Sequence, residues 1–200
     1  KNITADENFN TFSLSWYNNT DVDPATGLTP YINMQKVLKV CHDFVDNFDT
    51  NFSNLLFIGQ TGVGKTFLSN CIARALMDSC HSIIYLTAGE FFDSFKSDDF
   101  KEFGSSKFDT SFFVECDLLI IDDLGTEKAS DYNFSNLFNT INERLLRRKS
   151  IIISSNLEMP DIETRYSQRI FSRLVSAYSI LRLFGDDIRC MKKLSPTKRS

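Results

Sequence analysis

The sequence lacks the features that mark membrane and secreted proteins. None of its apolar runs approaches the roughly 20 residues that a helix needs to cross a bilayer, and no signal-peptide pattern opens the chain. The five cysteines form no C-x-x-C pair, and the two Cys-His dipeptides lie too far apart for a zinc-binding signature. We therefore expect a cytoplasmic protein, without a membrane partner, whose cysteines are reduced and mostly buried.

Internal repeats and low-complexity segments are absent as well, and so is a strong excess of positive charge. The net charge of −4 excludes a protein that coats DNA through bulk charge alone. The charges are distributed unevenly: residues 1–50 carry three basic and seven acidic side chains, whereas residues 165–200 carry nine basic and two acidic ones. Either a local basic surface or a solvated helix followed by a charged tail explains the C-terminal excess.

Apolar segments alternate along the chain in the pattern of an α/β protein. Five short runs predict strands, namely NLLFI, SIIYLT, DLLIID, SIIISS and YSILRLF. The segments between them predict helices, namely KTFLSNCIARALMDS, GEFFDSF, YNFSNLFNTINERLLRRK and DIETRYSQRIFSRLVSA. Near-continuous apolar strands that alternate with helices are typical of a parallel sheet covered on both faces. The sequence therefore predicts a three-layer fold with a five-stranded parallel sheet.

An N-terminal extension precedes the first predicted strand. Residues 1–28 are polar and rich in Asn, and the cluster DVDPATG indicates a turn. The following segment, TPYINMQKVLKVCHDFVDNF, has apolar residues at helical spacing. Thr29 is the expected N-cap of this helix and Pro30 its first residue. We expect residues 1–50 to form a short extension and a leading helix.

The octet GQTGVGKT, residues 59–66, directly follows the first predicted strand and opens a predicted helix. It fits G-x-x-x-x-G-K-[ST] and holds three of the eight glycines. Glycines allow backbone N–H groups to turn toward a phosphate, and the helix that follows adds its positive end. The lysine of this pattern neutralises the β- and γ-phosphates, and its Thr hydroxyl ligates Mg²⁺. The residues expected to hold ATP are Gly59, Gln60, Thr61, Gly62, Val63, Gly64, Lys65, Thr66 and Phe67.

A paired carboxylate ends a second buried strand, in the segment DLLIIDDLG. We expect Asp122 to hold Mg²⁺ together with Thr66. Asp123 occupies the place where many ATPases have a glutamate that polarises the attacking water. Because an aspartate is one methylene shorter, we expect hydrolysis to be slow or to need geometry supplied by a partner.

Further polar residues distinguish this chain from other phosphate-loop proteins. It has no N/T-K-x-D segment with which a GTPase reads guanine. Asn156 follows the strand SIIISS, where it either positions the attacking water or is a plain turn residue. Arg169 and Arg173 are four residues apart and therefore share one helix face, which faces either a neighbouring subunit or solvent. Arg189 follows the last predicted strand, within reach of the same nucleotide's phosphates.

Together these segments resemble the bacterial replicative helicase loaders of the DnaC/DnaI type. The segments that carry the resemblance, within residues 9–193, are FNTFSLSWY, NLLFIGQTGVGKTFLSNCIA, LLIIDDLGTE, SSNLEMP, QRIFSRL and GDDIRCMKK. This family consists of AAA+ ATPases related to the initiator DnaA and the transposition helper IstB. The resemblance implies an AAA+ ATPase domain over residues 51–193, followed by a basic tail over residues 194–200.

The resemblance also implies roles for single residues. Asp122 and Asp123 become the Walker B pair, and Asn156 becomes the sensor 1 residue. Arg169 becomes an arginine finger that acts on a neighbouring subunit's nucleotide, and Arg189 becomes the sensor 2 arginine. These assignments imply self-association into a ring or filament, with ATP and Mg²⁺ as cofactors.

The partners implied by the resemblance are the replicative DNA helicase and single-stranded DNA. Family members usually carry an N-terminal helicase-binding domain, and because the chain begins with Lys1 rather than Met, we expect a fragment that lacks it. Residues 91–113 map to a helical insertion associated with single-stranded DNA. Their interleaved Phe and Lys residues suit base stacking, although a Phe stripe facing the core explains them equally well.

The sequence thus predicts an ATP-dependent helicase-loader ATPase that binds single-stranded DNA and helps to place the replicative helicase. Two alternatives remain open. The first is an IstB-like transposition helper that acts on duplex DNA, and the second is a nucleotide-binding scaffold with little turnover. A phage-encoded loader is also compatible with the sequence.

Overall fold

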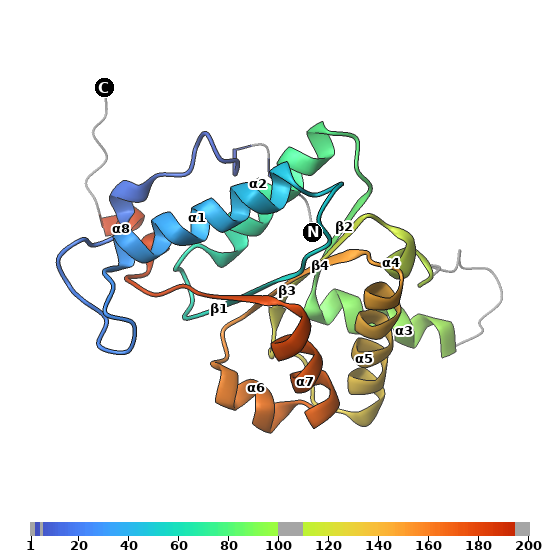
Figure 1. Cartoon of the computed structure of the whole chain (residues 1–200). Coiled ribbons are helices and arrows are strands. Elements are labelled where there is room, and N and C mark those ends of the chain that lie inside the picture. The colour runs from blue at the N-terminus through green and yellow to red at the C-terminus, as the bar shows by residue number, and fades with distance from the viewer. Residues whose placement is uncertain (1–2, 5, 100–109, 195–200) are drawn as a thin grey trace.

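The computed structural model describes residues 3–4, 6–99 and 110–194. It contains one sheet of five parallel strands in the order β2-β3-β4-β1-β5 (Figure 1). The strands are β1 (Leu55–Ile58), β2 (Ile83–Thr87), β3 (Leu118–Leu124), β4 (Ser150–Ser155) and β5 (Ser179–Arg182). The predicted five-stranded parallel sheet is therefore confirmed.

Helices cover both faces of this sheet. They are α1 (Pro30–Asp46), α2 (Lys65–Asp78), α3 (Ala88–Asp99), α4 (Phe112–Glu115), α5 (Asp131–Leu146), α6 (Met159–Arg165), α7 (Gln168–Ala177) and α8 (Ile188–Leu194), with a 3-10 helix η1 (Leu14–Trp16). In Figure 1, α1 and α2 lie on one face, and α3, α5, α6 and α7 lie on the other. A separate hydrophobic core fills each interface between sheet and helices. The fold is the predicted three-layer α/β arrangement.

The side chains of β3 alternate between the two cores. Leu118 and Ile120 pack in the core beneath α1 and α2, whereas Leu119 and Ile121 pack in the core beneath α3, α5 and α7. All four side chains are fully buried. Because both faces of this strand are covered, its apolar run is continuous rather than alternating, as is typical of parallel sheets.

The leading helix forms where the sequence predicts it. Thr29 is the N-cap, and its Oγ1 accepts a hydrogen bond from the N–H of Ile32 at 3.2 Å. Pro30 is the first helical residue, a position that needs no N–H donor. The apolar stripe of α1, including Met34, Val37, Cys41 and Phe44, is buried against α2 and the sheet. The predicted helix and its cap are therefore confirmed.

The prediction of one continuous helix before the last strand is wrong. The segment DIETRYSQRIFSRLVSA forms two helices, α6 and α7, because Tyr166 adopts an extended backbone with φ −102° and ψ 160°. Its ring is buried against Phe134, and its hydroxyl donates a hydrogen bond to Glu127 Oε1. Burying this aromatic side chain overrides the local helical spacing, so the chain turns before α7 begins.

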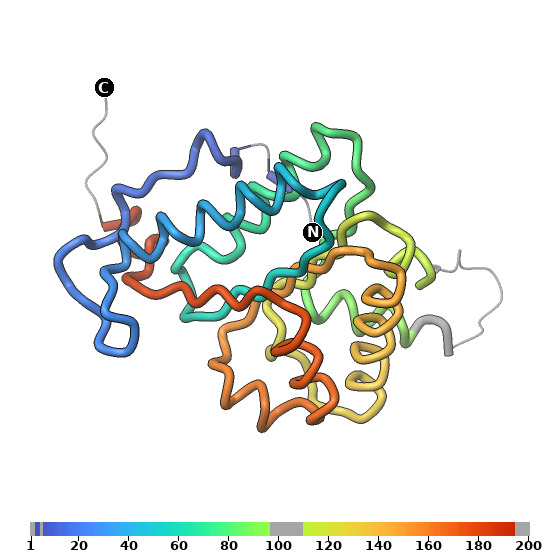
Figure 2. The backbone as a smooth tube through the Cα atoms, viewed as in Figure 1, coloured from blue at the N-terminus to red at the C-terminus, as the bar shows by residue number. Residues whose placement is uncertain are grey.

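Segments from the two ends of the chain lie side by side. Figure 2 shows the N-terminal segment running next to α8, and Lys192 Nζ lies 5.6 Å from the centre of the Trp16 ring. Among the helices that the structure describes, none is both long enough and apolar enough to cross a bilayer. The cysteines are free, and Cys41, Cys71 and Cys116 are buried.

Candidate nucleotide-binding site

The polar residues that the sequence singles out meet at one edge of the sheet. β4 lies between β1 and β3, so the glycine-rich loop after β1 lies close to the carboxylates of β3 and to Asn156 after β4. Lys65 Nζ donates a hydrogen bond to Asn156 Oδ1 at 2.7 Å. Thr66 Oγ1 donates to Asp122 Oδ2 at 3.1 Å. Residues that are distant in the sequence are thus in direct contact.

The glycine-rich loop needs its glycines for both conformation and space. Gly62 and Gly64 have φ values of 82° and 105°, which side chains rarely adopt. A Cβ on Gly62 would lie 2.1 Å from Asp187 Oδ1, and one on Gly64 would lie 2.6 Å from the Tyr17 hydroxyl. Gly64 is also the N-cap of α2 and makes no side-chain hydrogen bond there. The first N–H groups of α2 therefore have no side-chain cap, which suits the binding of an anion.

Lys65 is held within the loop that precedes it. Its Nζ donates to the carbonyl oxygens of Gly59 and Gln60, each at 2.6 Å, as well as to Asn156. Burial lowers the pKa of Lys65 to about 8, against the opposing effect of the nearby carboxylates Asp122 and Asp123. A phosphate beside this ammonium would favour its charged form.

Asp122 is a fully buried carboxylate surrounded by hydroxyl groups. Thr66 Oγ1 donates to its two oxygens at 3.1 and 3.2 Å, the Tyr85 hydroxyl donates to Oδ2 at 3.1 Å, and the Ser154 hydroxyl donates to Oδ1. A carboxylate beside a hydroxyl is the oxygen donor set that Mg²⁺ prefers. The residues present therefore fit a Mg²⁺ ion held by Thr66 and Asp122.

Asp123 has an unusual backbone conformation that explains its residue type. Its φ is 59°, in the left-handed region, and its N–H donates to Ser154 Oγ at 3.0 Å. Asp and Asn adopt this region more readily than other residues that carry a side chain, glutamate included. An aspartate in place of the more usual glutamate thus matches the backbone at this position.

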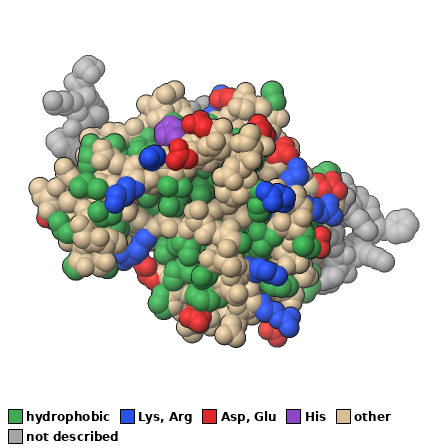
Figure 3. Space-filling view, in the orientation of Figure 1, with side chains coloured by type: hydrophobic (Ala, Val, Ile, Leu, Met, Phe, Trp, Pro, Cys, Tyr) green, Lys and Arg blue, Asp and Glu red, His purple; other side chains and the backbone are tan. Residues whose placement is uncertain are grey.

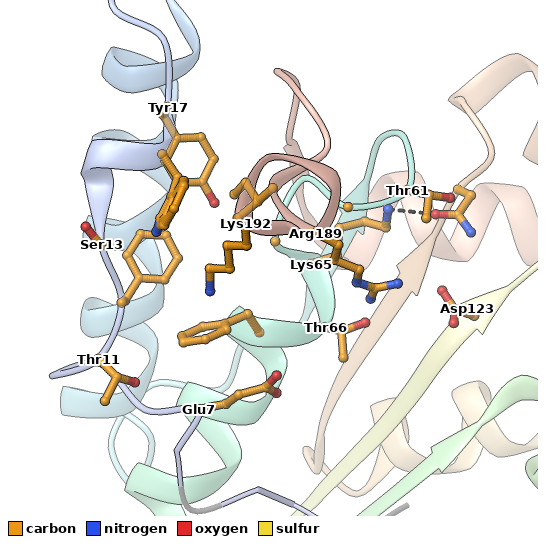
Figure 4. A pocket seen from close by; sticks show the side chains of 17 residues that line it. Glu7, Thr11, Ser13, Tyr17, Thr61, Lys65, Thr66, Asp123, Arg189 and Lys192 are labelled. Carbon is orange, nitrogen blue, oxygen red and sulfur yellow. Dashed lines mark hydrogen bonds between the residues drawn. The ribbon is translucent and has the colours of Figure 1, made fainter. Parts of the chain in front are cut away.

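One cavity brings these residues together with parts of the chain that the sequence analysis did not assign. Figure 4 shows its lining, which comes from the N-terminal segment, the glycine-rich loop, α2, the ends of β3 and β4, and α8. The predicted residues that line it are Thr61, Gly62, Gly64, Lys65, Thr66, Phe67, Asp123, Asn156 and Arg189. The unassigned ones are Glu7, Thr11, Phe12, Ser13, Trp16, Tyr17, Ile188 and Lys192.

The N-terminal segment forms an aromatic wall of this cavity. The Tyr17 hydroxyl donates to the carbonyl of Val63 at 3.1 Å, and the Phe12 ring lies 5.6 Å from that of Phe67. Trp16 also lines the cavity. The segment FNTFSLSWY was part of the family resemblance, but its irregular local pattern gave these residues no site role.

The C-terminal helix α8 closes another side of the cavity. The N–H of Ile188 donates to the Gly62 carbonyl at 3.1 Å, so α8 contacts the glycine-rich loop directly. Asp187 Oδ1 accepts the N–H of Arg189 at 2.8 Å, and backbone hydrogen bonds from Cys190 and Arg189 lower the pKa of the Asp187 carboxyl. Arg189 lines the cavity, and its positive charge lies close enough to Lys65 to add to the effect of burial in lowering the pKa of that lysine.

Arg169 and Arg173 lie elsewhere. Both are exposed on α7 and line a separate, shallow hollow with Phe138, Gln168 and Ser172. Arg173 donates to Asn142 Oδ1 of α5 at 3.1 Å. The two arginines share one helix face, as predicted, and neither lines the cavity described above, which is formed from the described residues of this chain.

The comparisons with known proteins identify the family. The family described as IstB-like ATP binding protein matches residues 32–195, which is most of the chain. The chain belongs to this family. The predicted kinship with DnaC, DnaI and IstB is therefore confirmed.

Named relatives agree with this assignment. The replicative helicase loader DnaC of Escherichia coli (strain K12) is 24% identical to the IstB-like chain over 151 residues, which cover 75% of the chain and 61% of DnaC. The phage-like element PBSX protein XkdC of Bacillus subtilis (strain 168) is 31% identical over 121 residues, which cover 58% of the chain and 44% of XkdC. The chain thus spans less than two thirds of either relative.

Solved structures share the fold. A crystal structure of the DnaC helicase loader has a TM-score of 0.68 at 21% identity and covers 86% of this chain and 96% of that one. A replication initiator DnaA bound to AMPPCP and single-stranded DNA has a TM-score of 0.64 at 20% identity and covers 76% of this chain and 46% of that one. The IstB-like chain therefore shares the fold of these DnaC and DnaA structures.

The segment expected to bind single-stranded DNA is largely part of the core where it is described. Phe91, Phe92 and Phe113 are buried, and Phe95 packs against them. The expected contribution of Phe100, Phe103, Lys101 and Lys107 lies outside the described residues. The Phe stripe facing the core, which the sequence left open, is the arrangement of Phe91, Phe92, Phe95 and Phe113, whereas Phe112 is exposed.

Two of the C-terminal basic residues that the structure describes are paired with acidic side chains. Arg165 is paired with Glu127 at 3.5 Å, and Arg182 with Glu158 at 3.2 Å. Figure 3 shows Lys and Arg side chains interspersed with Asp and Glu on the face in view. On this face, a nucleic acid would meet alternating charges rather than a continuous basic surface.

Proposed function

We propose that this IstB-like protein is an ATP-dependent helicase-loader ATPase that binds ATP with Mg²⁺ and single-stranded DNA and helps to place the replicative helicase. The observation that carries the nucleotide part is the meeting of Lys65 and Thr66 of α2 with Asn156, which follows β4, at one cavity that Arg189 of α8 also lines. We assign the ATPase domain to residues 51–193 and a basic tail to residues 194–200. The extension within residues 1–50 supplies one wall of the site.

The nucleotide lies along this cavity in our proposal. The phosphates contact the glycine-rich loop and the start of α2, where Lys65 and Arg189 supply positive charge. The base lies in the aromatic compartment lined by Phe12, Trp16 and Phe67, because flat aromatic rings stack on a purine. When bound, Mg²⁺ neutralises phosphate oxygens, and Thr66 and Asp122 are the residues that hold it.

The residues that carry out hydrolysis come from two copies of the chain. Asp123 accepts a proton from the attacking water, and Asn156 orients that water while also contacting Lys65. Arg169 is absent from the cavity of its own chain and is exposed, which supports a role on the nucleotide of a neighbouring copy. Membership of the AAA+ family supports ATP hydrolysis in general, and we propose that turnover is slow and depends on assembly.

The DNA and helicase parts of the proposal come from the relatives. DnaC carries the name of a replicative helicase loader, and the solved DnaA is bound to single-stranded DNA. The helicase contact is proposed for the whole protein, since the chain spans 61% of DnaC. The match to the IstB-like family favours a second candidate, a transposition helper that acts on duplex DNA.

DNA preference separates the two candidates. Binding to labelled single-stranded and duplex DNA of equal length is measured with ATP and Mg²⁺ at one fixed salt concentration. Tighter binding to the single strand supports the loader, and tighter binding to the duplex supports the transposition helper. The Lys65→Ala variant is the control, because a preference that persists without nucleotide binding is not ATP-dependent. If the chain binds ATP but shows no turnover at any protein or DNA concentration, a nucleotide-binding scaffold replaces both.

A further inference from the structure

Ser154 of β4 lies opposite the two carboxylate residues of β3. Its hydrogen bonds to them have so far been given no function. It is fully buried on β4, two residues before Asn156. Its hydroxyl donates to Asp122 Oδ1 and accepts the N–H of Asp123 at 3.0 Å. One hydroxyl group thus connects the side chain of one aspartate to the backbone of the next.

The strand pairing explains why Ser154 can reach both residues. The pairs on either side are Ile121 with Ile153 and Leu124 with Ser155. Asp122 and Asp123 together therefore lie opposite Ser154 alone, which is a β-bulge. A bulge leaves one residue outside the regular ladder, and the Ser154 hydroxyl accepts the N–H of that residue, Asp123. The bulge also gives Asp123 its φ of 59°.

The Asp122 carboxylate is held from both neighbouring strands. Ser154 of β4 binds Oδ1, and the Tyr85 hydroxyl of β2 binds Oδ2 at 3.1 Å. Both donors are neutral, so they fix the plane of the carboxylate without supplying a counter-charge. The negative charge stays available for a cation, and Thr66 lies against the same two oxygens.

We propose that Ser154 is a positioning residue of the nucleotide site. It aims the Asp122 carboxylate at the ion that Thr66 shares, and it fixes the bulge that directs Asp123 toward the cavity. Tyr85 assists from the opposite strand. This inference rests on the proposed ATP and Mg²⁺ binding and names the groups outside the ion's own ligands that orient those ligands.

The neighbouring residue Ser155 provides a matched control. It is equally buried on β4, and its hydroxyl donates to the Leu124 carbonyl at 2.6 Å and accepts the N–H of Leu157 at 3.1 Å. It therefore makes as many hydrogen bonds as Ser154 but contacts neither carboxylate residue. Loss of either hydroxyl removes similar structural support, so only a positioning role separates the two variants.

The experiment uses the fluorescence of Trp16, which lines the cavity and is the only tryptophan of the chain. ATP is titrated with excess EDTA, and Mg²⁺ is then titrated at fixed ATP. For Ser154→Ala we expect ATP affinity in EDTA within about twofold of the unmodified chain and a Mg²⁺ midpoint raised about 10-fold, the usual effect of losing a group that orients a metal ligand. Ser155→Ala should leave the Mg²⁺ midpoint unchanged, and Ser154→Thr, which keeps the hydroxyl, should restore it.

Each outcome decides a separate question. A Ser154→Ala midpoint equal to that of Ser155→Ala overturns the positioning role while the unmodified chain still binds Mg²⁺ and ATP. If the unmodified chain binds no ATP under either condition, the proposed function itself fails. If Ser154→Ala does not fold, Tyr85→Phe removes only the opposite hydroxyl. An unchanged Mg²⁺ midpoint in that variant overturns the inference, and a raised midpoint supports it.

Discussion

Charged side chains gather both at the cavity that follows β1 and on the face of α7 that carries Arg169 and Arg173. The two regions differ in how far these side chains are buried. Lys65, which lines the cavity, and Asp122, which accepts a hydrogen bond from the cavity residue Thr66, are buried and bonded to neighbours within the chain. On α7, Arg169 and Arg173 are exposed, and Arg173 has a single polar contact with α5. Buried charges need such partners, because leaving one unpaired away from water is costly.

Under the proposed function, one chain completes the cavity by itself and Arg169 of α7 acts on a neighbouring copy. At the cavity, Lys65, Thr66 and Asn156 are held by hydrogen bonds within the chain. On the face of α7, Arg169 and Arg173 are exposed, and Arg173 donates to Asn142 of its own chain. This exposed face is therefore suited to contact a neighbouring copy, and the following changes test this contrast from the largest expected effect to the smallest.

Lys65→Ala should remove the organised charge of the cavity. We expect nucleotide affinity to fall about 100-fold or more, because a charge-assisted contact to phosphate is worth up to about 3 kcal/mol. Titration followed by Trp16 fluorescence measures the change. Lys36→Ala, an exposed lysine on α1, is the control and should bind as before. An unchanged affinity in Lys65→Ala would contradict the phosphate-loop assignment.

Arg169→Ala should leave the cavity intact and remove only the exposed group. We expect nucleotide affinity within about twofold and turnover lowered by about 100-fold at high protein concentration, less than the roughly 10³- to 10⁵-fold effect of other arginine fingers because the proposed turnover is slow. Mixing Arg169→Ala with Lys65→Ala should restore part of the turnover, since one copy supplies the site and the other the arginine. Arg74→Ala, which changes a half-buried arginine on α2, is the control. Normal turnover in Arg169→Ala alone would contradict the in-trans role.

Nucleotide affinity should depend on pH through Lys65. Its pKa is about 8 in the nucleotide-free chain and rises when phosphate binds, so affinity should be constant below pH 8 and then fall by up to about tenfold per pH unit. Lys65 has the opposite effect on stability. Its pKa is higher in the unfolded chain, so without nucleotide the free energy of unfolding should increase as pH rises above 8.

ATP is titrated at several pH values between 7 and 9 into the unmodified chain and into the Arg169→Ala variant. Because Arg169 is exposed and lies outside the cavity, the variant should show the same pH profile as the unmodified chain. A flat profile in the unmodified chain would show that Lys65 does not titrate in this range.

The smallest effect concerns the backbone of Asp123. At φ 59°, a Cβ costs about 1–2 kcal/mol unless the residue is Asn or Asp, so Asp123→Gly should be more stable than Asp123→Ala by about 1 kcal/mol. Within helices and strands, a glycine variant is normally less stable than the alanine variant at the same position. Asp131 at the start of α5 is the matched control, where Ala should be more stable than Gly. Thermal unfolding of the four variants measures both differences, and the same order at both positions would contradict the strain argument.

Local patterns in the sequence were enough to predict much of this molecule. The strands follow from short apolar runs, and the start of α1 follows from Thr29 and Pro30. The loop at residues 59–66 follows from glycine spacing. These features depend on the conformations available to neighbouring residues, so they can be recognised without knowing how the chain packs.

Long-range packing decided the rest. Trp16 and Tyr17 become a wall of the cavity only because the N-terminal segment returns to the glycine-rich loop. Tyr166 breaks a helix because its ring is buried. Ser154 gains its two contacts because β4 lies between β1 and β3 and opposes a bulge. The sequence by itself determined most of the helices and strands and most of the charged residues of the candidate site. The tertiary structure decided which of these residues meet, because burial and strand order join residues that no local pattern connects.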